Sequence, residues 1–171
     1  PGGSDLYYRA RIASHLAELA GTKRFFLTLL FADPHFNYRC PYPYYARFTD
    51  PAYEGPNKYQ AMSNPNVETT AGREREAGQI RGLYAGCVSA LDDNIGFVAD
   101  TLRRVGLDRR TMLIITGDHG ERLPDRKSFR YGRNGAWLDP EQFHVPLVII
   151  NPPVPVARAV VPATARHLDL M

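Results

Sequence analysis

An aspartate and a histidine stand next to each other directly after a run of mostly apolar residues. The run covers residues 111–116, and Asp118 and His119 follow it between Gly117 and Gly120. A carboxylate and an imidazole supply one oxygen and one nitrogen ligand to a divalent cation. Glycines let the backbone turn sharply and approach a ligand closely. Asp118 and His119 are therefore candidate metal ligands, with a capping aspartate and a surface histidine as the alternative interpretation.

A second histidine, His35, follows another apolar run in the same way. Residues 25–31 are almost entirely apolar, and the sequence Asp-Pro-His comes two positions later. Pro34 restricts the backbone, so His35 is directed away from the end of the run. A histidine in such a place can hold an anionic oxygen or protonate a leaving group. Taken alone, His35 is equally well explained as a core or loop histidine.

Two segments have the apolar spacing of amphipathic helices. A first helix is expected over residues 5–20, and a second, clearer one over residues 80–102 with Gly106 at its end. Between them, residues 33–72 are crowded with proline, tyrosine and asparagine. Irregular segments of this length are uncommon in compact domains and are usually functional.

Three short apolar runs predict buried strands, over residues 25–31, 111–116 and 145–150. Strands and helices that alternate along the chain indicate an α/β fold, with a largely parallel sheet flanked by helices on both faces. Ligands bind beyond the carboxyl ends of the strands in such sheets. The sequence therefore predicts that His35 and the Asp118–His119 pair meet at one edge.

The composition is that of a folded globular protein. The chain has 171 residues, of which 44% are hydrophobic, enough for one domain with its own core. The net charge of +3 is spread along the chain and does not indicate a nucleic-acid partner. No apolar run reaches the roughly 18 residues of a membrane span. The two cysteines form neither a disulfide framework nor a zinc set, and Cys87 is predicted to be a small core residue.

These motifs occur in the same order as those of the sulfatase family of the alkaline phosphatase superfamily. Residues 26–38 resemble the family segment in which a hydrophobic strand ends in Pro-His before an aromatic loop, and residues 83–96 resemble its long helix. Residues 111–121 closely match its strand-plus-metal-ligand motif. Residues 145–149 and 167–171 resemble its last two signatures. Several motifs in order are more specific than any one of them.

The resemblance implies that residues 1–171 form a partial sulfatase-like catalytic domain with an incomplete alkaline phosphatase-like fold. Asp118 and His119 would be two ligands of the catalytic metal, and His35 would contact the sulfate or phosphate group that is transferred. The resemblance favours Ca²⁺, and the imidazole ligand also suits Mn²⁺ or Zn²⁺. The implied activity is that of a metal-dependent sulfuric ester hydrolase acting on sulfate esters.

The nucleophile of the resembled family has no counterpart in the chain. That nucleophile is a formylglycine made from a cysteine or serine in the motif Cys-x-Pro-x-Arg. After Cys40 the proline comes one place too late, at Pro43, and Tyr44 stands in the place of the arginine. Cys40 is therefore a poor candidate. We expect the formylglycine and the other metal carboxylates outside these residues, and residues 1–171 alone to be inactive and poorly stable.

Two further positions depart from the family pattern. Arg133, followed by Asn134 and Gly135, stands where members often place a His-Gly or a lysine that touches the anion. Its planar cation with forked donors can take over that contact, or it is a solvated loop arginine. His144 precedes Val-Pro-Leu where many members have arginine. It either lines the site or merely ends the strand, and we predict the second.

Other functions fit the same residues. A phosphodiesterase, phosphonate hydrolase or phosphoethanolamine transferase of the superfamily would carry the same Asp-His pair. A non-catalytic module that binds anions or glycans would explain the missing histidine near Asn134. The nucleophile distinguishes the enzymes, because Cys-x-Pro-x-Arg indicates a sulfatase and a bare threonine or serine indicates phosphoryl transfer.

Overall fold

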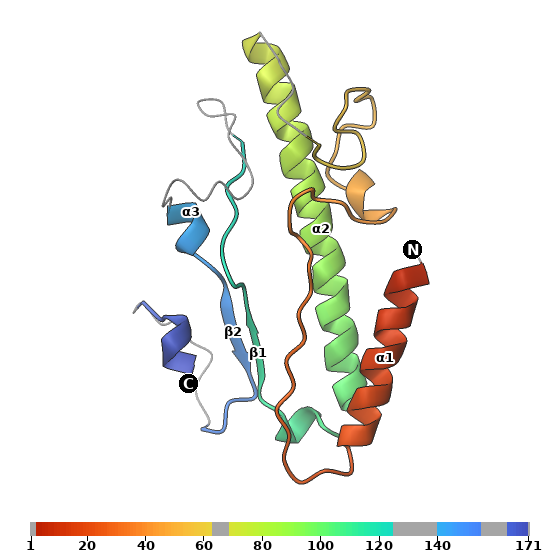
Figure 1. Cartoon of the computed structure of the whole chain (residues 1–171), viewed down its shortest axis with the longest axis vertical. Coiled ribbons are helices and arrows are strands. Elements are labelled where there is room, and N and C mark those ends of the chain that lie inside the picture. The colour runs from red at the N-terminus through yellow and green to blue at the C-terminus, as the bar shows by residue number, and fades with distance from the viewer. Residues whose placement is uncertain (1–2, 63–68, 125–139, 155–163, 171) are drawn as a thin grey trace.

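The computed structural model describes residues 3–62, 69–124, 140–154 and 164–170, with side chains from residue 7 onward in these ranges. Its largest element is helix α2 (Thr70–Arg104), which runs along the long axis of the molecule (Figure 1). The Thr69 hydroxyl accepts a hydrogen bond from the backbone N–H of Gly72 (3.1 Å) and caps the first turn. The predicted helix over residues 80–102 is confirmed, and it begins earlier than the apolar pattern indicated.

Helix α1 (Gly3–Leu19) packs against the carboxyl-terminal half of α2, which confirms the helix predicted over residues 5–20. Leu16 of α1 is buried against Val98 and Leu102 of α2. A second connection comes from Arg110, whose guanidinium donates hydrogen bonds to the carbonyl oxygens of Ala20 and Thr22 (2.8 and 3.1 Å). The two helices therefore pack together around one buried cluster.

The irregular segment over residues 33–61 covers the middle of α2 and forms a second buried cluster with it (Figure 1). The fully packed members of this cluster are Tyr38, Cys40, Ala61, Ile80, Leu83, Cys87 and Ala90. Gly82 and Gly86 of α2 allow the segment to come close. A Cβ atom added to Gly82 would lie 2.4 Å from the Phe48 carbonyl oxygen, and one added to Gly86 would lie 2.6 Å from that of Tyr44.

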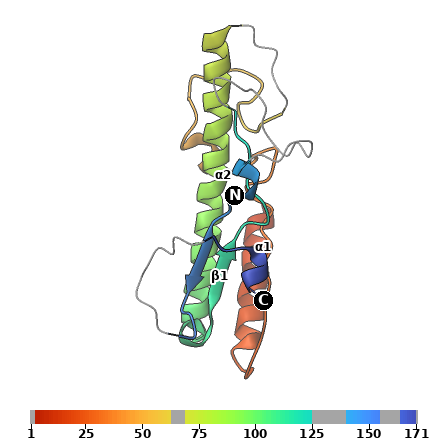
Figure 2. The same ribbon diagram turned by 90° about the vertical axis from the view of Figure 1, so that its left-hand side faces the viewer.

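Strands β1 (Leu113–Thr116) and β2 (Leu147–Ile150) pair with each other in antiparallel orientation. Leu113 lies opposite Ile150, and Thr116 lies opposite Leu147. The strands predicted over residues 111–116 and 145–150 are thus confirmed as strands, in shorter form. Their predicted burial is not seen here, because β1 alternates between half-buried and exposed residues and all four residues of β2 are exposed. Figure 2 shows the pair in front, with α1 and α2 both behind it.

The predicted parallel sheet with helices on both faces is not seen in the part of the chain that the structure describes. The sheet there has two antiparallel strands, and residues 25–31 form no strand. Phe25, Leu29 and Phe31 pack on the α1–α2 cluster, whereas Phe26 and Leu30 are 94% and 87% exposed. A strand needs the backbone of a neighbour, and residues 25–31 pair with neither β1 nor β2, the two strands of the described sheet.

Candidate functional site

The turn after β1 holds the predicted metal ligands. The carboxylate of Asp118 is 81% exposed, and its Oδ1 accepts a hydrogen bond from the backbone N–H of His119 (3.0 Å). The other oxygen, Oδ2, lies 4.0 Å from His119 Nε2. The two side chains therefore lie on the same side of the turn, with the carboxylate open to solvent.

The His119 ring is half-buried and held by a hydrogen bond. Nδ1 lies 2.8 Å from the carbonyl oxygen of Gly120. Because a carbonyl only accepts, Nδ1 carries the proton and Nε2 presents its lone pair on the side of Asp118. Metal-binding histidines are oriented by such a bond on the nitrogen that does not bind the metal.

Gly120 is required by the contact that fixes this turn. Its backbone N–H donates to the carbonyl oxygen of Gln142 (2.7 Å), in the short helix α3 (Pro140–Phe143). A Cβ atom at Gly120 would lie 1.9 Å from the carbonyl oxygen of Glu141. The turn therefore rests directly on the backbone of α3.

His35 lies in a turn of the irregular segment and is exposed. Its backbone N–H donates to the Ala32 carbonyl (2.9 Å), and its own carbonyl accepts from the N–H of Tyr38 (3.0 Å). In the ring, Nδ1 lies 2.5 Å from the Phe36 carbonyl oxygen, so the carbonyl again selects the Nδ1-protonated form. Nε2 is then the nitrogen available to a substrate.

A carboxyl group that sequence reasoning missed, Glu121, connects the two loops. Burial raises the pKa of Glu121, and the nearby Tyr38 hydroxyl, His119 and His35 act in the opposite direction. The structure thus brings His35 and His119 to the same half-buried carboxyl group, although they are far apart in sequence. Glu121 follows the Asp-His-Gly motif directly, and that position was the available signal.

His167 is a second residue that was given no role from the sequence. It belongs to the 3₁₀ helix over His167–Leu170, and its Nε2 lies 2.8 Å from the Gly117 carbonyl oxygen and 3.4 Å from the Thr116 hydroxyl. The signature at residues 167–171 therefore supports the turn that carries Asp118. His144 is exposed at the end of α3, and Arg133 lies outside the described residues.

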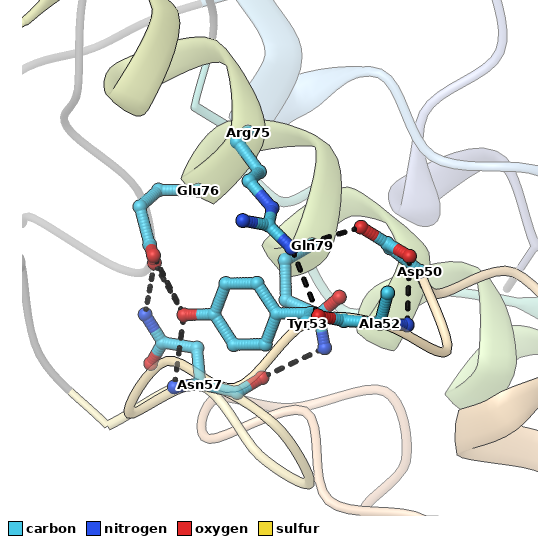
Figure 3. Close-up of polar contacts among 7 residues, drawn as sticks. All are labelled: Asp50, Ala52, Tyr53, Asn57, Arg75, Glu76 and Gln79. Atoms are coloured by element: carbon cyan, nitrogen blue, oxygen red, sulfur yellow. Dashed lines mark hydrogen bonds and ion pairs between the residues drawn. The ribbon is translucent and has the colours of Figure 1, made fainter.

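A buried polar cluster fixes the irregular segment to the first turns of α2 (Figure 3). We call it the Glu76 clamp; its members are Tyr53, Asn57, Glu76 and Gln79, each no more than 8% exposed. The Tyr53 hydroxyl lies 2.7 Å from both carboxylate oxygens of Glu76, and Asn57 Nδ2 donates to Oε2 (3.0 Å). Gln79 Nε2 donates to the Asn57 carbonyl (2.9 Å). Burial and the Glu76 hydrogen bond raise the pKa of Tyr53 to about 12.

The Glu76 clamp is connected to the His35 turn through the backbone. The side-chain oxygen of Asn57 accepts a hydrogen bond from the N–H of Met62 (2.8 Å). The neighbouring N–H, of Ala61, donates to the Asn37 carbonyl (2.7 Å), two residues beyond His35. The clamp therefore restrains the position of the His35 turn.

Neither cysteine is placed as the nucleophile of ester hydrolysis. Cys40 and Cys87 are buried together in the cluster over α2, which confirms the prediction that Cys87 is a core residue. Over the described ranges, no group of three or more histidine, cysteine, aspartate or glutamate side chains is arranged to hold a metal ion. Of the predicted site residues, Asp118 and His119 are the candidate metal ligands that the described part of the chain brings together. None of the described helices is long and apolar enough to cross a membrane.

Comparison with known proteins identifies the family and several relatives. The family model described as Sulfatase matches residues 3–171. A multifunctional alkaline phosphatase superfamily protein, PehA, from Trinickia caryophylli is 38% identical over 76 residues, which are 44% of this chain and 14% of that protein. An ulvan-active sulfatase from Formosa agariphila is 30% identical over 110 residues, 60% of this chain and 20% of that protein.

A longer match is found with the uncharacterized sulfatase YidJ from Escherichia coli. It is 25% identical over 155 residues, which are 86% of this chain and 30% of that protein. The chain therefore spans less than a third of the length of each of these relatives.

Proposed function

We propose, because this chain belongs to the sulfatase family and has its alkaline phosphatase-like α/β fold, that it is part of a metal-dependent hydrolase of sulfate esters. The match over residues 3–171 carries this proposal. The placement of Asp118 and His119 directly after β1, with 4.0 Å between Oδ2 and Nε2, supports it. The Nδ1 hydrogen bond of His119 supports it further, since it leaves Nε2 to bind a metal.

Asp118 and His119 would hold the metal together with ligands from the rest of the protein. The family resemblance favours Ca²⁺, while the imidazole also suits Mn²⁺ or Zn²⁺. A divalent cation bound there would polarise an oxygen of the ester being cleaved. The nucleophile, expected to be a formylglycine, would likewise come from outside these residues.

His35 would act on the group that is transferred. Because Nδ1 is held by the Phe36 carbonyl oxygen, Nε2 is the ring nitrogen left for the substrate. Protonation of Nε2 would supply a hydrogen-bond donor and a positive charge to the anion. A charged His35 ring acts in turn on Glu121, because its nearby positive charge lowers the pKa of that carboxyl group. Arg133 is proposed as a further anion contact on sequence grounds alone.

The leaving group of the ester would rest on tyrosines of the irregular segment. The rings of Tyr42 and Tyr59 flank that of Tyr45 edge-on, at 6.0 and 5.3 Å between centroids, and both are more than half exposed. Exposed tyrosine rings of this kind stack on sugar or aryl groups.

The rest of the protein would complete the sheet. We propose that residues 25–31 become a strand of a largely parallel sheet, because Phe26 and Leu30 expose apolar surface that a folded domain normally buries. The residues of β2, all exposed here, would be covered in the same way.

A phosphate or phosphonate ester is the second candidate substrate. The similarity to a relative described as a multifunctional alkaline phosphatase superfamily protein favours it, because that name is not restricted to sulfate esters. The roles proposed for Asp118, His119 and His35 are the same for either ester.

Turnover by the whole protein tests these proposals. Hydrolysis of an aryl sulfate, an aryl phosphate diester and an aryl phosphonate would be measured with and without a chelator. We expect the sulfate to be hydrolysed in preference to the other two esters. This turnover should be lost when the chelator is added and in the variant Asp118→Asn. Preference for the diester or phosphonate would establish the second candidate. Calcium binding without turnover of any ester would indicate a binding module.

A further inference from the structure

Two thiols from distant parts of the sequence lie against each other in the core. Cys40 belongs to the irregular segment and Cys87 to α2; they are 5% and 0% exposed and share one buried cluster. A hydrogen bond joins the two side chains. The proposed reaction uses neither residue, so the pair needs a separate explanation.

The backbones that carry these cysteines also come unusually close. Gly86 precedes Cys87, and a Cβ atom added to it would lie 2.6 Å from the carbonyl oxygen of Tyr44 and 3.1 Å from the Cα of Tyr45. The segment that begins at Cys40 therefore rests directly on the α2 backbone. A disulfide needs such an approach, because its two Cα atoms lie only about 4.4–6.8 Å apart.

We propose that Cys40 and Cys87 form a reversible disulfide that ties the His35-bearing segment covalently to α2 when the protein meets a small-molecule disulfide such as oxidised glutathione. This proposal rests on the packing of the two thiols and is independent of the proposed sulfatase activity. It assigns a redox modification to a pair of side chains in the core.

The surroundings of the two thiols determine which of them reacts first. The hydrogen bond from the Cys87 thiol lowers the pKa of Cys40, against the effects of burial and of Asp33. The same contact and burial raise the pKa of Cys87. Cys40 is therefore the more readily ionised thiol, and the thiolate is the nucleophile in disulfide exchange. It also lies in an irregular segment, which opens locally at lower cost than the middle of a long helix.

The exchange then proceeds in two balanced steps. The Cys40 thiol loses its proton, and its sulfur attacks one sulfur of oxidised glutathione; the glutathione S–S bond breaks and one reduced glutathione leaves. The Cys87 thiol loses its proton and attacks the Cys40 sulfur, and the second reduced glutathione leaves. In total, two protein thiols are oxidised to one disulfide and one oxidised glutathione is reduced to two thiols.

Peptide mapping of the whole protein tests the proposal directly. Trypsin cuts after Arg39 and Arg47 and after Arg81 and Arg103, so Cys40 and Cys87 fall in the separate peptides 40–47 and 82–103. The protein would be incubated with oxidised glutathione, denatured with an excess of a maleimide that blocks free thiols, and digested. The expected product is a linked pair of these two peptides that disappears on reduction.

Two results would overturn the proposal. One is recovery of both peptides with maleimide on their cysteines. The other is glutathione retained on Cys40 with no linked peptide, since Cys87 would then fail in the second step. The matched control is Cys87→Ser, which should retain glutathione on Cys40 and yield no linked peptide.

A thermal measurement covers the case in which serine disturbs the core. In the wild-type protein, oxidation should raise the Tm by several degrees, and a reductant should reverse the rise, because a cross-link restricts the unfolded chain. An unchanged Tm in wild-type protein that has been treated with oxidised glutathione in the same way would contradict the proposal without any variant.

Discussion

The irregular segment over α2 and the edge beyond β1 are built in opposite ways. Over α2, the Glu76 clamp and the cluster around Tyr38 are buried, and Glu76 has donors from two side chains. Beyond β1, the Asp118 carboxylate is 81% exposed and β2 has no buried residue. The first region has its partners within this chain, whereas the second presents a carboxylate and apolar side chains that are open to solvent here.

The sharpest test of this contrast is Phe26→Ala in the whole protein. Phe26 is 94% exposed in the structure of this chain, and removing a side chain so exposed should cost almost nothing. If the rest of the protein buries residues 25–31 in a sheet, the same change should cost about 3–5 kcal/mol of unfolding free energy. Denaturant unfolding measures it. A cost below about 1 kcal/mol would mean that this surface stays open.

His35→Ala should produce the next largest effect, on turnover alone. Loss of a group that stabilises charge on the substrate should lower kcat on the order of 10²-fold, about 2.7 kcal/mol of barrier. The unfolding free energy should hardly change, because His35 is exposed.

His144→Ala is the matched control, since His144 is also exposed but lies at the end of α3. Full activity in the His35 variant together with loss in the His144 variant would show that the wrong histidine was assigned to the anion.

Alkaline unfolding tests the Glu76 clamp. The pKa of Tyr53 is raised from 10 to about 12 in the folded protein, so the unfolded chain ionises first as the pH rises. Stability is therefore complete below pH 10 and falls by about 2–3 kcal/mol as the pH approaches 12. Tyr53→Phe should lose this part of the pH dependence. An identical pH profile in the variant would show that the hydroxyl is not buried against Glu76.

Glycine-to-alanine changes along α2 should give the smallest effects, with opposite signs. At Gly82 and Gly86 the added carbon meets loop backbone at 2.4 and 2.6 Å, so alanine should cost about 1–3 kcal/mol. At Gly78 and Gly96 nothing lies within 4 Å, and alanine should add roughly 0.5–1 kcal/mol through its helix propensity. Urea unfolding of the four variants measures these changes in unfolding free energy. Equal changes in all four variants would contradict the close packing at Gly82 and Gly86.

Local sequence patterns predicted the helices, two of the strands and the Asp-His motif. They did not predict strand pairing, which depends on segments distant in the sequence. The apolar periodicity was sufficient to predict α2, since a helix satisfies its own backbone. The apolar run was sufficient to predict β1 as a strand but not its exposure, because β1 alternates between half-buried and exposed residues. Residues 25–31 have the composition of a strand. Whether they pair as one depends on the backbone of other segments, which their own sequence does not reveal. The alternation of helices and strands indicated a parallel sheet, and the β1–β2 register is antiparallel.

The candidate site follows the same division. Asp118, His119 and His35 could be selected because each directly follows an apolar run. The burial of Glu121 and of the clamp residue Glu76 could not be predicted, because a carboxyl group buried by a distant loop has the same local sequence as a solvated one. Their surroundings depend on contacts of residues such as Tyr38 and Tyr53, which only the folded chain brings together.

The glycines of α2 also bear on the order in which the molecule folds. Gly72, Gly78, Gly82, Gly86 and Gly96 all lie within this one helix, and each weakens an isolated helix by about 1 kcal/mol relative to alanine. On its own, α2 is therefore a poor helix despite its length. Where the backbone of residues 44–48 docks on Gly82 and Gly86, helix formation and loop docking reinforce each other. The middle of α2 and residues 44–48 should then fold, and unfold, as one cooperative unit.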